Sequence, residues 1–173
     1  MKQYAMLAGV LMMVAGCGSS SPAAPSAPPN TITFTAALSA ANENPPITNA
    51  DTNARGTARV TLNLTRDGAG AITGATADFS FDLTGFPAGT TIILAHVHEG
   101  APTINGSARI NSGLSPANTV TLANGSQANL SYPNLAVPSG IAQQMIDNPN
   151  GYYFNVHSAL NPSGAVRGQL VRQ

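Results

Sequence analysis

The chain has 173 residues, a formal net charge of zero and only 8% charged residues. This length suffices for one domain and is short for two. The charges are scattered without runs, which excludes the basic patch that nucleic acid or an anionic lipid surface would require. A single cysteine cannot form an internal disulfide or a zinc-binding cluster, so the fold depends on packing.

The N-terminal segment has the features of a bacterial lipoprotein signal peptide. Lys2 precedes an apolar, uncharged run over residues 4–15. A membrane-spanning helix needs roughly 20 apolar residues, so this shorter run predicts a cleavable signal. The run ends in Val14-Ala15-Gly16-Cys17, which resembles the lipobox, where the cysteine is acylated and the chain is cut before it.

Lipidation of Cys17 would anchor the exported protein to a bacterial membrane. The alternative is an ordinary secretory signal with a chance cysteine. Gly18, rather than aspartate, follows the cysteine, which favours the outer membrane or cell surface over the inner membrane. Serine, proline and alanine over residues 18–30 indicate an extended linker. The predicted organisation is a signal peptide over 1–16, the lipidated cysteine and linker over 17–30, and one folded domain over 31–173.

From Thr31 onward, strand patterns alternate with turns rich in glycine, proline and asparagine. The segments 59–65 and 75–84 alternate polar and apolar residues on either side of a turn, which predicts a hairpin. Other strands are expected over 91–98, 119–122, 127–130, 152–157 and 165–171, with one short helix over 141–146. This pattern predicts an all-β domain, an antiparallel β-sandwich or barrel with one short helix.

The whole chain has three histidines, His96, His98 and His157. His96 and His98 lie two positions apart on a predicted strand, so both side chains should leave the same face. If even positions oppose even positions in the C-terminal hairpin, His157 lies across from, or diagonal to, Arg167. Asn155 would then lie on that same face. The sequence therefore predicts a strip of polar side chains beside the His-x-His pair.

Two interpretations of this polar strip stay open. Three neutral imidazoles at one place are a set of ligands for zinc or copper and leave one position for water. Alternatively, the histidines form a hydrogen-bonded structural cluster that ties strand ends to loops. Glu43, in a stiff turn that contains two prolines, is a candidate supporting residue together with Asn155 and Arg167. No Ser-His-Asp or Cys-His arrangement can be argued, so no catalytic residue is assigned.

Three blocks of sequence resemble the CHRD domain, a module first described in chordin and also found in many bacterial exported proteins. The first block runs from Phe34 to Pro46 and leads to Gly56-Thr57-Ala58, the second is Ala95-His96-Val97-His98-Glu99-Gly100, and the third covers 152–170 with Asn155-Val156-His157-Ser158, Asn161-Pro162 and Arg167-Gly168-Gln169-Leu170. The blocks follow one another over nearly the whole predicted domain. Ala165 departs from the pattern, because the family usually has an acidic residue there. If that acid contributes to binding, this chain lacks part of the site.

The resemblance implies an immunoglobulin-like or superoxide-dismutase-like β architecture. It also implies a non-catalytic binding module with an unidentified envelope or extracellular ligand. The stretch from His96 to Glu99 is similar to the copper-site sequence of copper-zinc superoxide dismutase. That enzyme needs more than three histidines and a disulfide, so dismutase activity is not expected. The alternative function is a protein that binds one copper or zinc ion through His96, His98 and His157, and no other cofactor is assigned.

Overall fold

The computed structural model describes residues 28–173. The predicted signal peptide, Cys17 and most of the linker lie outside the described residues. Within residues 28–173, no helix combines the length and apolar character needed to cross a membrane.

The described residues form ten strands, one α-helix and two short 3-10 helices. In chain order the elements are β1 (Thr31–Ser39), η1 (Ala40–Asn42), β2 (Arg55–Arg66), β3 (Ile72–Thr84), β4 (Thr90–Glu99), β5 (Ala108–Asn111), β6 (Val120–Leu122), β7 (Gln127–Val137), α1 (Ser139–Asp147), η2 (Pro149–Gly151), β8 (Tyr152–Ser158), β9 (Val166–Gln169) and β10 (Val171–Arg172).

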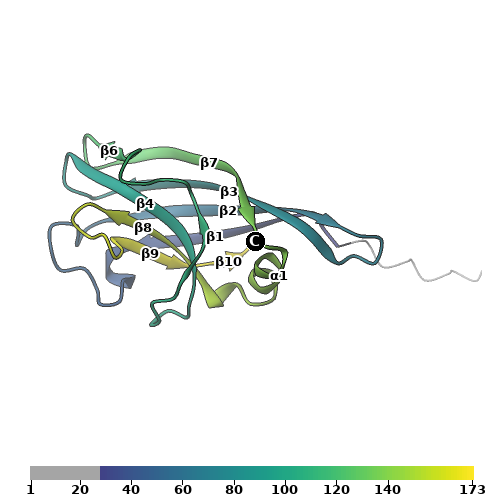
Figure 1. Ribbon diagram of the computed structural model, residues 1–173. Coiled ribbons are helices and arrows are strands. Elements are labelled where there is room, and N and C mark those ends of the chain that lie inside the picture. The colour runs from purple at the N-terminus through teal and green to yellow at the C-terminus, as the bar shows by residue number, and fades with distance from the viewer. Residues whose placement is uncertain (1–27) are drawn as a thin grey trace, which may run out of the picture.

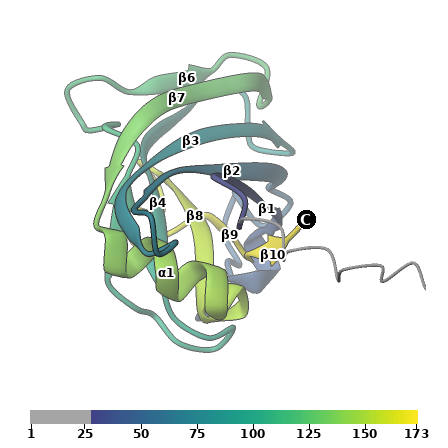
Figure 2. The ribbon, with the colours of Figure 1, turned by 90° about the vertical axis from the view of Figure 1, so that its right-hand side faces the viewer.

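All strands belong to one antiparallel sheet with the order β5-β4-β8-β9-β1-β2-β3-β7; β10 pairs with β1, and β6 pairs with β4. The sheet curves until its outer strands β5 and β7 approach each other, which makes a nearly closed barrel (Figures 1 and 2). Helix α1 follows β7 and buries Ala142 and Met145 against the core. The predicted all-β antiparallel sandwich or barrel with one short helix is confirmed, and of the two forms the sheet is closer to a barrel.

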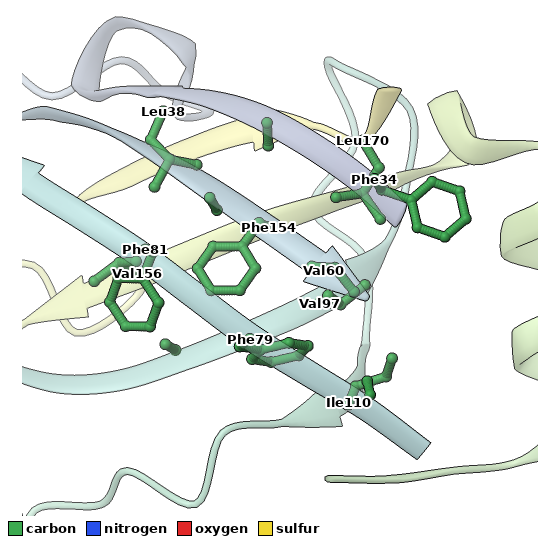
Figure 3. Packing of buried hydrophobic residues seen from close by; sticks show 14 of the residues in the cluster. Phe34, Leu38, Val60, Phe79, Phe81, Val97, Ile110, Phe154, Val156 and Leu170 are labelled. Atoms are coloured by element: carbon green, nitrogen blue, oxygen red, sulfur yellow. The ribbon is translucent and has the colours of Figure 1, made fainter. Parts of the chain in front are cut away.

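The predicted hairpin of the two long alternating segments is confirmed as β2 and β3. The register pairs Val60 with Phe79 and Ala58 with Phe81, so alternate residues of both strands enter the barrel. Phe79 lies edge-on to Phe154 of β8 at 5.1 Å between ring centroids, and Phe81 lies 5.2 Å from the same ring (Figure 3). Aromatic packing therefore joins the hairpin to the strand that carries His157.

Strand β7 is longer than its sequence pattern predicts, and it runs to Val137 instead of ending near residue 130. Two residues interrupt its alternation, because Asn129 and Asn134 both have φ of 58°. Their backbone N–H groups donate to the carboxylates of Asp82 and Asp78 on β3, at 2.7 and 2.8 Å. These hydrogen bonds satisfy the backbone N–H groups at the two irregular positions of the strand. The interruptions also break the alternation of polar and apolar residues on which strand prediction depends.

Strand β8 is buried on both faces. Phe154 and Val156 point into the barrel, and Asn155 and His157 therefore leave its outer face. The same alternation on β4 puts Val97 in the core. The outer faces of β4, β8 and β9 are therefore the place where the polar residues of the sequence motifs gather.

Candidate metal-binding site

The structure brings the three histidines together on the outer wall of the barrel. The ligand-capable nitrogens of His96, His98 and His157, one from each ring, all lie within 4.8 Å of one another. Nδ1 of His96 is 3.2 Å from Nε2 of His157. The His98 ring centroid lies 5.3 Å from that of His96 and 5.9 Å from that of His157. The three rings therefore surround one point.

Strand register explains this convergence. His96 pairs with Asn155 across β4 and β8, and His98 pairs with Tyr153. On β9, Arg167 pairs with Asn155. His157 is two residues beyond Asn155, so it lies diagonal to Arg167, as the predicted hairpin register allows. Strand pairing alone thus puts all three imidazoles beside Asn155 on one face.

Two of the imidazoles are oriented by backbone carbonyls. Nδ1 of His98 lies 2.9 Å from the carbonyl oxygen of Gly106, and Nδ1 of His157 lies 3.0 Å from that of Pro162. A carbonyl oxygen only accepts, so both Nδ1 atoms must carry the proton. In each neutral ring Nε2 then holds the lone pair. A histidine that binds a metal is usually oriented in this way by a hydrogen bond from its second nitrogen.

The contact between His98 and Gly106 requires glycine at position 106. A β-carbon there would collide with the carbonyl oxygen of Glu99. The Glu99 side chain is 45% exposed and pairs with Arg109 at 2.7 Å, away from the histidines. Among the described residues, no carboxylate or cysteine joins the three histidines within metal-ligand distance.

Burial keeps the three imidazoles neutral. Desolvation, assisted by the neighbouring His157 and His98, lowers the pKa of His96 to about 4. Desolvation also lowers the pKa of His157 to about 4, against the opposing effect of its bond to Pro162. The pKa of His98 is lowered, again mainly by burial. All three rings are therefore unprotonated at neutral pH, which is the state that a metal ion requires.

Tyr153 and Arg167 extend the cluster along the strand face. The ring of Tyr153 stacks on that of His98 with centroids 5.0 Å apart and planes 10° from parallel. The guanidinium carbon of Arg167 lies 3.9 Å from the centroid of the Tyr153 ring. This cation–π contact holds the aromatic ring against His98.

Arg167 is 1% exposed and fastens the loop that covers the site. Its Nη2 donates to the carbonyls of Ala101, Pro102 and Ile104 at 3.1, 2.7 and 3.2 Å. Its Nη1 donates to Oδ1 of Asn105 at 3.0 Å. Residue 106, which orients His98, follows directly, so Arg167 positions the loop that fixes this imidazole.

Glu43 comes from the loop after β1 and reaches the same face. Its Oε1 accepts a hydrogen bond from Nδ2 of Asn155 at 2.8 Å, in a buried contact. Gly164 makes room for this pair, because a β-carbon there would lie 2.8–3.0 Å from both carboxylate oxygens and from Nδ2 of Asn155. Burial raises the pKa of Glu43 to about 7, although Asn155 and Arg167 oppose the shift.

A second buried carboxylate fixes the loop that orients His157. Oδ2 of Asp51 accepts from Oγ of Ser158 and from Nδ2 of Asn161, both at 2.6 Å. The backbone N–H of Asn161 donates to Oγ of Ser158 at 3.0 Å. Residue 162, whose carbonyl orients His157, follows in the same loop. Asp51 is 1% exposed, so this network is part of the protein interior.

The structure thus places His96, His98, His157, Asn155 and Arg167 on one face, with Glu43 bonded to Asn155. Sequence reasoning missed Tyr153, although its place two residues before Asn155 on the same strand could have indicated it. It also missed Asp51, which lies in a loop with no periodic pattern. Ala165 is fully buried, so an acidic side chain at this position would enter the core region.

The fold and site define a small all-β domain with a partly buried cluster of three neutral histidines on its outer wall. The family model of the CHRD domain matches residues 34–170, most of the chain. The chain therefore belongs to the CHRD domain family, as the resemblance of its three blocks predicts. Family membership supports a binding or interaction module as the general role. No curated protein and no solved structure matches the chain.

Proposed function

We propose that this CHRD protein binds one zinc or copper ion through His96, His98 and His157. The observation that carries the proposal is the convergence of three neutral imidazoles within 4.8 Å. Imidazole nitrogens suit both metals, and sites with three protein ligands keep a fourth position open. The proposed role is binding and not catalysis. The domain binds the metal ion itself, or binds a further molecule through that ion.

Nitrogen spacing supports this choice. Two nitrogens about 2.0–2.1 Å from a tetrahedral zinc ion are about 3.3–3.4 Å apart. Nδ1 of His96 and Nε2 of His157 are already 3.2 Å apart. The widest separation in the cluster is within 4.8 Å, so a shift of roughly 1 Å in one ring would complete the triangle around an ion.

A purely structural cluster is the competing interpretation. Nε2 of His98 argues against it, because this buried atom has no hydrogen-bond partner among residues 28–173. Buried polar atoms nearly always have a partner, and an unsatisfied one costs about 1–3 kcal/mol. A metal ion would use this lone pair, whereas a structural cluster leaves it unsatisfied.

We further propose that the protein is exported and anchored to a bacterial membrane by lipid on Cys17, at the outer membrane or cell surface. A chain with one cysteine directly after a short apolar signal supports this placement. The proline-rich linker would hold the domain away from the lipid surface. The histidine cluster would then meet metal ions or ligands of the cell envelope or the exterior.

Elemental analysis of the purified protein tests metal binding. We expect one equivalent of zinc or copper in the wild type after loading and dialysis. His98→Ala and His98→Gln should lose it. Removing a group that only hydrogen-bonds a metal ligand already lowers metal affinity about 10–100-fold, and removing a ligand costs more. Asn63→Ala is the control, since Asn63 lies on β2 and bonds Asp78. Equal, substoichiometric metal in wild type and His98 variants would overturn the proposal.

A further inference from the structure

Asn155 lies beside the histidine cluster on the same face of the sheet. It pairs with His96 across β4 and β8, and it lies two residues from His157 on β8. His98 is the diagonal neighbour of Asn155, because it lies two residues from His96 on β4. Directly paired side chains in a sheet lie about 5 Å apart, and diagonal ones about 7–8 Å. The side chain of Asn155 is therefore next to every proposed metal ligand.

The two ends of the Asn155 amide have different surroundings. Its Nδ2 donates to Oε1 of Glu43 at 2.8 Å. Its Oδ1 is buried and has no hydrogen-bond partner within residues 28–173. Asn155 is 2% exposed, and its neighbour Arg167 already directs both Nη atoms to the loop over residues 101–105. This acceptor therefore needs a donor that the surrounding side chains do not supply.

We infer that the fourth metal position holds water or hydroxide that donates a hydrogen bond to Oδ1 of Asn155, an inference that rests on the metal-binding function proposed above. Glu43 acts as a positioning residue. Because its Oε1 accepts the hydrogen bond from Nδ2 of Asn155, it keeps Nδ2 turned toward itself and Oδ1 turned away. The centre thus prefers a ligand that carries a proton over an anion without one.

Gly164 supports the same assignment from a third loop. The glycine leaves the space in which the Glu43 carboxylate and the Asn155 amide meet, since a β-carbon would contact both groups. Its φ of 138° is also one that residues with side chains rarely adopt. The distant loop that carries Glu43 and the turn after β8 thus converge to fix the orientation of one amide.

Azide binding to the copper-loaded protein tests this inference. Azide coordinates copper(II), gives a charge-transfer absorption and carries no proton for Oδ1 of Asn155. We expect the wild type with one equivalent of Cu²⁺ to show a bound, exchangeable water by pulsed electron paramagnetic resonance in D₂O. Asn155→Leu should bind azide at a roughly fivefold lower concentration, the size of one net hydrogen bond. Asn63→Leu is the matched control, because Asn63 also donates from a strand to a carboxylate, Asp78.

Glu43 is tested by a double-mutant cycle. Glu43→Leu releases the amide of Asn155 to turn, and it should also tighten azide binding. Removing the carboxylate charge would by itself favour binding of the azide anion. That contribution of charge would be the same in the wild-type and Asn155→Leu backgrounds. We therefore expect the effect of Glu43→Leu to be at least halved in the Asn155→Leu background, as coupling between contacting groups requires.

The outcomes separate the two proposals. A wild type that takes up no copper overturns both, because the same ligands would bind zinc more weakly than copper(II). A wild type that binds copper, with azide half-saturation in Asn155→Leu within about twofold of wild type, overturns only the inference about Asn155. If Asn155→Leu fails to fold by circular dichroism, Glu43→Leu decides, and unchanged azide binding in that variant overturns the inference.

Discussion

Nδ1 of His96 and Nε2 of His157 lie 3.2 Å apart, although the two residues are 61 positions apart in the chain. Nδ1 of His157 is committed to the carbonyl of Pro162, so Nε2 is the acceptor and His96 supplies the proton between the rings. A metal ion would replace this shared proton with little movement of either ring. The short distance between these nitrogens thus suits both the metal-free pair and the proposed metal-bound form.

The metal-free imidazoles should resist protonation. Folding lowers the pKa of His96 and His157 from 6.5 to about 4. The stability that their neutral state provides is thus present above pH 6.5 and is lost as pH falls from 6.5 toward 4, because the unfolded chain then binds more protons. Nuclear magnetic resonance of the imidazole carbons should show no titration of either ring above about pH 5. Titration midpoints near 6.5 would contradict the buried, coupled arrangement.

Glu43→Gln isolates the buried carboxyl. Folding raises the pKa of Glu43 from 4.5 to about 7. Between pH 4.5 and pH 7 the folded protein therefore holds a proton on Glu43 that the unfolded chain has lost. Its contribution to stability is present below pH 4.5 and is lost as pH rises through 7. As pH rises from 5 to 8, the wild type should lose about 2 kcal/mol of unfolding free energy that Glu43→Gln keeps. Urea denaturation at the two pH values measures the difference, and parallel pH profiles would show that Glu43 stays ionised.

Cys17→Ser tests membrane anchoring. The serine hydroxyl does not take the lipid that a thiol takes, so the variant should leave the membrane pellet for the soluble fraction of the envelope or the medium. The linker and the domain are unchanged, which makes the wild-type chain expressed in parallel the natural comparison. Continued pelleting of Cys17→Ser would count against lipidation.

Local patterns were enough to predict the long hairpin and the shared face of two histidines. The period of two identified the β2–β3 hairpin, and the spacing of His96 and His98 put both rings on one side. The same alternation in the C-terminal hairpin indicated that His157 lies across from, or diagonal to, Arg167, and the structure has the diagonal arrangement. These features depend on neighbours within one strand or one hairpin, where sequence order and spatial order agree.

Contacts between distant loops could not be predicted in this way. The partner of Asn155 is Glu43, 112 positions away, and the carbonyls that Arg167 binds belong to residues 101–104, more than 60 positions away. No periodic pattern specifies such pairs, because they depend on how the closed sheet brings its loops together. The short strand β5 was missed for a related reason, since only four residues take part.

X-ray absorption spectroscopy of the zinc- or copper-loaded protein tests the central claim most directly. Metal held by His96, His98 and His157 should show about three imidazole nitrogens at about 2.0 Å, with one additional light-atom ligand. The multiple scattering of imidazole rings distinguishes these ligands from carboxylate or water. A spectrum without imidazole scattering, or with oxygen ligands only, would contradict a metal centre built from these three histidines.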